Sequence, residues 1–133
     1  MATKDNKSQQ KVNLLHNAVI ATDTATNTSS IDTADYDMGV MLSMSVTAFT
    51  DGTYVLSLED SPDNSAWTAV ASEKLIGDAP SVAALTSASA GLIATLGAIS
   101  TNQYVRGVIT STGTTNGATV NVQSIMKGEY NPQ

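Results

Sequence analysis

The sequence predicts an all-β fold, a single-domain β-sandwich that is jelly-roll-like in its strand content. Apolar and small polar residues alternate along several short stretches, which is the period-two pattern of half-buried strands. Turn-forming Asp, Asn, Gly, Ser and Thr separate these stretches, and about seven to nine strands result. Little helical periodicity is present, so the pattern is typical of a sandwich or jelly roll.

The clearest strand pattern runs from residue 38 to residue 59. Residues 38–48 alternate between apolar and small side chains, and residues 53–59 repeat that alternation. Asp51-Gly52 lies between them and supplies a turn that tolerates positive φ. We therefore predict a hairpin whose tip is Asp51-Gly52.

The remaining elements follow from the same criteria. Further strands are predicted over residues 12–20, 66–71, 92–97, 102–110 and 118–126. Residues 111–117 are interpreted as the turn of a second hairpin. Residues 77–90 are expected to form a surface connector. An Ala-rich helix over residues 81–90 is the weaker alternative, because Ser and Thr crowd it and no capping box is present.

The composition limits both the core and the class of protein. A chain of 133 residues is long enough for one core, and at 41% hydrophobic but only 5% aromatic residues that core should be thin and aliphatic. The net charge of −6 argues against nucleic-acid binding by the folded body. The sequence has no cysteine, which excludes disulfides, thiolate zinc sites and cysteine nucleophiles.

The polar N-terminus predicts a flexible arm. Residues 1–12 hold three of the six basic residues, Lys4, Lys7 and Lys11, and lack the apolar segment of a signal peptide. We expect this arm to order on a partner, and we assign residues 13–133 to the sandwich domain. No apolar run of about 18 residues occurs, so no membrane span is expected, and synthesis should take place in the host cytoplasm.

Candidate catalytic and metal-binding residues are few. His16 is the only histidine, and a lone histidine without a nearby carboxylate motif is expected to be structural. Two acidic groups could be proposed as cation ligands, but they lack the glycine and terminal glutamate of a calcium loop and are expected to be solvated or capping. These groups are Asp32, Asp35 and Asp37, and Glu59, Asp60, Asp63 and Asn64. We predict no enzyme activity, no cofactor and no metal.

The single arginine and the single tryptophan are the most informative side chains. Arg106 lies in the middle of a predicted strand, where a guanidinium should find a carboxylate across the sheet or at a subunit contact. Trp67 is expected to belong to the core or to cover a sheet edge. If it were a sugar-stacking platform instead, the chain would be a carbohydrate-binding module.

Two stretches carry a resemblance to a known family. Residues 53–70, Thr-Tyr-Val-Leu-Ser-Leu-Glu-Asp-Ser-Pro-Asp-Asn-Ser-Ala-Trp-Thr-Ala-Val, combine an extended strand, an acidic-Ser turn and a Trp-Thr-x-Val strand. Residues 102–110, Asn-Gln-Tyr-Val-Arg-Gly-Val-Ile-Thr, are similar to an Arg-Tyr-x-Arg strand, with Gln103 where a base is common. Together with the polar turn 111–120, these stretches resemble capsid decoration (cement) proteins of tailed bacteriophages over residues 38–127.

The resemblance implies a function in the virion. It implies a homo-oligomer, with a trimer favoured and a dimer as the alternative, that binds the major capsid protein on the outer face of the phage head and stabilises the shell. The candidate interface residues are Lys4, Lys7, Lys11, Trp67, Tyr104, Arg106 and Tyr130. A tail or head-completion β-sandwich protein is the alternative within the virion.

Overall fold

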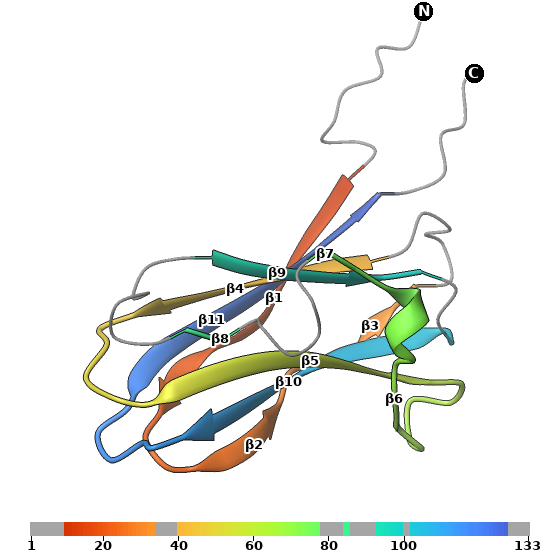
Figure 1. The fold of residues 1–133 in the computed structure, drawn as a ribbon. Helices are drawn as coiled ribbons and strands as arrows, with labels where there is room; N and C mark the ends of the chain where they lie inside the picture. Colours follow the sequence, from red (N-terminus) through yellow and green to blue (C-terminus); the bar gives the residue numbers. More distant parts are fainter. Residues whose placement is uncertain (1–9, 34–39, 78–83, 86–92, 100–101, 128–133) are drawn as a thin grey trace, which may run out of the picture.

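Two antiparallel sheets lie face to face in the computed structural model of the chain, which describes residues 10–33, 40–77, 84–85, 93–99 and 102–127 (Figure 1). Sheet A has the strand order β1-β11-β4-β9-β7 and sheet B the order β2-β10-β5-β6, with β3 also paired to β10 and β8 to β5. The strands of sheet A are β1 (Gln10–Ile20), β11 (Ala118–Lys127), β4 (Val40–Thr47), β9 (Ile93–Ala98) and β7 (Leu75–Gly77). Those of sheet B are β2 (Thr24–Asn27), β3 (Ile31–Asp32), β10 (Tyr104–Thr112), β5 (Thr53–Ser61), β6 (Thr68–Ala69) and β8 (Ala84–Leu85).

The predicted all-β sandwich is confirmed, and its connectivity is that of a jelly roll. The chain passes from sheet A to sheet B between β1 and β2 and between β4 and β5, and it returns to sheet A between β10 and β11. Four strands of each sheet, β1-β11-β4-β9 and β2-β10-β5-β6, give the eight-stranded arrangement of that fold. A short 3-10 turn, η1 (Ser72–Lys74), leads into the additional edge strand β7.

Both predicted hairpins are wrong, although their strands exist. β4 and β5 flank Asp51-Gly52 as expected, but β4 pairs with β11 and β9 in sheet A, while β5 pairs with β10 in sheet B. The strands on either side of residues 113–117 are likewise divided between the sheets. Each connection is therefore an arch across the core. The alternation of side chains specifies which face of a strand is buried, and it does not specify the sheet to which the strand belongs.

The core lies between the sheets and is aliphatic, as the composition predicts. β4 shows the underlying pattern, because Val40, Leu42, Met44 and Val46 are buried while the residues between them are only partly buried. β5 contributes Tyr54, Leu56 and Leu58 from the opposite sheet. Tyr54 is the one aromatic side chain of this cluster among the described residues.

Two other predicted elements differ from the structure. The strand predicted over residues 66–71 is reduced to β6 at Thr68–Ala69. Within the predicted connector, residues 84–85 form β8 instead of part of a helix, and residues 78–83 and 86–92 lie outside the described part of the chain. The first strand begins at Gln10, so the boundary drawn at residue 12 falls inside β1.

The three arches lie at the same end of the sandwich and are bonded to one another (Figure 1). Asp51, between β4 and β5, accepts hydrogen bonds from the backbone amides of Thr115 at 3.0 Å and Gly117 at 2.8 Å. Asp23, between β1 and β2, accepts one from the amide of Thr114 at 2.7 Å. Carboxylates of two arches thus satisfy the amides of the third, which fixes the spacing of the sheets at this end.

Candidate functional site

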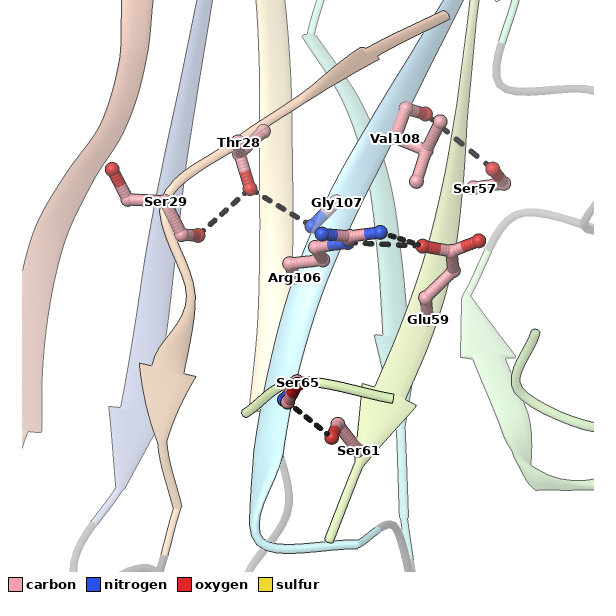
Figure 2. Close-up of polar contacts among 9 residues, drawn as sticks. All are labelled: Thr28, Ser29, Ser57, Glu59, Ser61, Ser65, Arg106, Gly107 and Val108. Carbon is pink, nitrogen blue, oxygen red and sulfur yellow. Dashed lines mark hydrogen bonds and ion pairs between the residues drawn. The ribbon is translucent and has the colours of Figure 1, made fainter. Parts of the chain in front are cut away.

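The outer face of sheet B carries the candidate site. Along β10 the side chains of Val105 and Ile109 are buried, so the alternating residues Tyr104 and Arg106 lie on the opposite, outer face. Arg106 stands directly opposite Glu59 of β5 in the antiparallel register. Its Nε and Nη2 atoms donate to Glu59 Oε1 at 2.9 and 2.8 Å (Figure 2).

Trp67 covers the guanidinium. Arg106 Cζ lies 4.3 Å from the centroid of the indole ring, within the range of a cation–π contact. Trp67 is half-buried and comes from the loop between β5 and β6. The arginine is therefore stacked on one side and paired with a carboxylate on another, and we call Trp67, Arg106 and Glu59 the stacked cluster.

The loop that presents Trp67 is held by its own polar side chains. Asp63 accepts hydrogen bonds from the amides of Ser65 at 3.0 Å and Ala66 at 2.9 Å and from the hydroxyl of Ser61 at 2.9 Å. These bonds hold the pKa of Asp63 below its usual value, and the bond from the Ala66 amide has the largest effect. Asn64 adopts a φ of +61°, which asparagine tolerates. The turn chemistry predicted for this loop therefore positions the indole ring.

β10 is fixed on its other side as well. The Thr28 hydroxyl accepts a hydrogen bond from the amide of Gly107 at 2.9 Å and donates to the carbonyl of Ser29 at 2.9 Å (Figure 2). A Cβ at Gly107 would lie 2.9 Å from Leu42 Cδ2 of the facing sheet, so this position is closely packed. Arg106 is thus carried by a strand that is anchored on both sides, which leaves its backbone little freedom.

The stacked cluster is partly exposed to solvent. The side chains of Arg106 and Glu59 are 20% and 28% exposed. An exposed ion pair contributes about 0.2–1 kcal/mol, and an exposed cation–π contact contributes about 0.5–1 kcal/mol. Neither dominates the stability of a domain, so the main effect of the cluster is to present a rigid Trp-Arg surface. Trp and Arg are among the residue types most enriched in the hot spots of protein interfaces.

The stacking of Arg106 on the indole also bears on the carbohydrate-binding alternative. One face of the Trp67 ring is occupied by the guanidinium. Within the described residues, the aromatic pair is Phe49 with Tyr54 in the arch region, at a centroid distance of 6.4 Å. A platform of coplanar aromatic rings around Trp67 is therefore not formed by the described side chains.

The structure brings together some of the sequence-predicted interface residues. Tyr104 lies two residues from Arg106 on the same face of β10, and Trp67 contacts Arg106 directly. Lys11 belongs to β1 in the other sheet, where it is the register partner of Met126. Lys4, Lys7 and Tyr130 lie outside the described residues.

Glu59 was missing from the predicted interface set. The signal for it was the expectation that Arg106 needs a carboxylate across the sheet, and that expectation is confirmed. Asp60, its neighbour, faces inward, is buried, and accepts the amide of Asn102 at 2.9 Å. Glu59, Asp60 and Asp63 thus have separate partners, and the described residues contain no cluster of three or more potential metal ligands.

His16 lies on the inner side of β1, at the register position of buried Val122. Its Nε2 atom and the Ser124 hydroxyl are buried without a hydrogen-bond partner. Burial lowers the pKa of His16, so the imidazole is neutral near neutral pH. No carboxylate is bonded to it in the described structure, and it belongs to the packing of β1 on β11.

The chain is similar in fold to a solved structure. No family model matches the chain, and no curated protein matches it. The PBSX exported protein XepA matches with a TM-score of 0.59 and 21% sequence identity; the match covers all of this chain and 42% of that chain. The chain thus spans less than half the length of XepA. At this identity the likeness shows a shared β-sandwich fold. No described helix has the length and apolarity required to cross a membrane.

Proposed function

We propose that this chain is a structural protein of a phage virion and that it acts as a capsid decoration protein. The observation that carries the assignment to a phage virion is the structural likeness to the PBSX exported protein XepA, which extends over all of this chain and 42% of XepA. The sequence resemblance to decoration proteins of tailed phages supports the same origin independently. A jelly roll with braced arches supplies the rigid scaffold that a cement protein needs.

The stacked cluster is the proposed contact with the major capsid protein. Trp67 and Arg106 are fixed before binding, so little conformational entropy is lost when a partner covers them. An oligomer that engages several capsid subunits at once needs only a modest contact from each copy, because linked contacts raise the overall avidity. The protein is then located on the exterior of the capsid.

The first test is co-sedimentation of the purified protein with purified shells and, separately, with purified tails of candidate phages. Saturation of shells at a fixed copy ratio to the major capsid protein supports decoration. Saturation of tails instead overturns decoration and supports the tail alternative. A protein that binds neither particle contradicts the assignment to the virion.

The second test concerns the contact residues. Trp67→Ala should weaken retention on shells by about 30-fold, as expected for a hot-spot aromatic. Arg106→Lys keeps the charge and loses the planar stack, and it should weaken retention in the same direction. Phe49→Ala is the matched control, because Phe49 is a partly buried aromatic residue at the opposite end of β5. Equal retention by Trp67→Ala and the wild type would remove the stacked cluster from the contact. If the wild type were retained on glycans and the Trp67→Ala variant were not, the carbohydrate-binding alternative would be favoured instead.

A further inference from the structure

The central part of the outer face of sheet A carries no charged residue, from residues 119–125 of β11 across β4 and β9, and Lys127 at the end of β11 falls on the same face by register. The strand register places partly exposed serine, threonine, asparagine and glutamine side chains across β11, β4 and β9. The residues of this face whose exposure is described are Leu14, Asn17, Val19, Met41, Ser43, Ser45, Thr47, Ile76, Thr95, Gly97, Thr119, Asn121, Gln123 and Ile125. Lys74 stands at its margin, in the 3-10 turn before β7. A sheet face of this kind differs from a solvated one, which normally carries Lys and Glu.

One row of the face is apolar from β11 to the edge strand β7. Ile125 is the register partner of Met41, Met41 of Gly97, and Gly97 of Ile76. Ile125 and Ile76 are 42% and 41% exposed. Gly97 has no side chain, and a Cβ there would lie 2.9 Å from Ile76 Cγ1, so the isoleucine lies across β9 and keeps the row flat.

The charge of the protein indicates what covers this face. The chain carries a net charge of −6. Most described acidic residues lie elsewhere, in the arches at Asp23 and Asp51 and in sheet B or its loops at Asp32, Glu59, Asp60 and Asp63. Glu73 stands beside Lys74 in the turn before β7, at the margin of the face. Two copies that meet through the arches or through sheet B bring like charges together, which is unfavourable. Two copies that meet through the central part of the outer face of sheet A avoid this repulsion.

The edges of sheet A are less suited to association than its face. β1 has a bulge between Leu14 and His16, and the carbonyl of Leu15 accepts a hydrogen bond from the amide of Ser29 at 3.1 Å. The opposite edge strand, β7, is only three residues long. Bulges and short strands are devices that prevent edge-to-edge pairing.

We propose that the outer face of sheet A is a two-fold interface between two copies of this chain. β4 is the central strand of the five, so a two-fold axis parallel to β4 superposes the apolar row on itself and places Met41 against Met41 of the second copy. The strand spacings give a face of roughly 600 Å² per copy, near the roughly 800 Å² of a standard interface. Of the trimer and the dimer that the sequence resemblance allows, this face favours the dimer, because a self-complementary flat face suits isologous pairing.

The test uses the protein alone, without capsids, so its outcome is independent of the proposed function. The wild type should sediment as a dimer at high micromolar concentration. Ser45→Lys places two like charges at the axis and should raise the dimer dissociation constant by at least roughly tenfold. The matched control is Ser57→Lys, which changes a serine of similar exposure on the outer face of sheet B, opposite Val108. Its dissociation constant should stay near that of the wild type.

Two further measurements separate a lost interface from a damaged fold. A mixture of Ser45→Lys and Ser45→Glu should form a heterodimer, although each variant alone is monomeric and melts near the wild-type temperature. Because the chain has no cysteine, Ser45→Cys should be joined to its own copy by a short bismaleimide, and Ser57→Cys should not. A monomeric wild type, an oligomer that Ser45→Lys leaves intact, or a trimer without Ser45→Cys crosslinking each overturns the proposal.

Discussion

Two glycines of the β10–β11 arch have similar backbone conformations and different surroundings. Gly113 has a φ of +66° and Gly117 a φ of +84°, both in the region that favours glycine. No atom lies within 4 Å of a Cβ built on Gly113, whereas a Cβ on Gly117 would overlap the carbonyl oxygen of Ile20. Gly117 therefore permits the close contact between the β10–β11 and β1–β2 arches.

Substitution of these glycines separates the two effects. Gly113→Ala should lower the free energy of unfolding by about 1 kcal/mol, the cost of a left-handed alanine. Gly117→Ala should lower it by more than about 3 kcal/mol, because the arches must also move apart. Urea denaturation of both variants measures the difference. Equal losses at the two positions would show that the arches are not in contact in solution.

The stacked cluster shows how far single residues could be predicted from the sequence. An arginine in the middle of a strand requires a carboxylate, so a partner across the sheet was predictable, and Glu59 supplies it. The stacking of Trp67 on Arg106 was not predictable, because it depends on the loop that Asp63 organises. A side chain that reaches its partner through a turn leaves no periodic signal in the sequence.

Among the elements, β1 offers a direct test of where the sandwich begins. Gln10, Lys11 and Val12 are paired with Lys127, Met126 and Ile125, so the first strand includes residues that polarity alone assigns to the arm. A chain that lacks residues 1–14 should melt at a lower temperature than a chain that lacks residues 1–9. The further deletion removes five residues that pair with β11. Identical melting temperatures would place the start of the stable strand after residue 14.

Strand positions were predicted from the sequence better than strand partners. The period of two located β4, β5, β10 and β11, because it reflects burial on one face. Asp51-Gly52 is also the typical sequence of a hairpin turn, yet here the Asp51 carboxylate binds amides of another arch. Ala48, with a φ of +48°, begins a connection too long for a two-residue turn. The sheet to which each strand belongs is decided by contacts between distant segments, which a local pattern does not record.

For the whole molecule, three kinds of group define a pH range of maximal stability. Burial lowers the pKa of His16 from 6.5, so the unfolded chain binds more protons below that value and stability falls. Amide hydrogen bonds, the Gly117 amide first, lower the pKa of Asp51 from 3.8, and a further loss follows below that pH. Burial raises the pKa of Tyr54 from 10.0, so the unfolded chain ionises first and stability falls above pH 10.0.

We expect His16 to cause the loss of stability between neutral and acidic pH. The urea midpoint of the wild type should decrease between about pH 7 and pH 5. His16→Gln keeps a polar side chain that does not titrate, and its midpoint should be constant over the same range. A wild-type midpoint that does not change there, or a variant that retains the decrease, contradicts the assignment to His16.

The position of β11 has a consequence for synthesis of the protein. β11 follows every other described strand in the sequence, and it lies between β1 and β4, which have no direct pairing with each other. While the chain is still on the ribosome, β1 and β4 have been made and the strand that joins them has not. Sheet A is therefore completed only after β11 has been synthesised, and a product interrupted before residue 118 lacks the strand that joins β1 to β4.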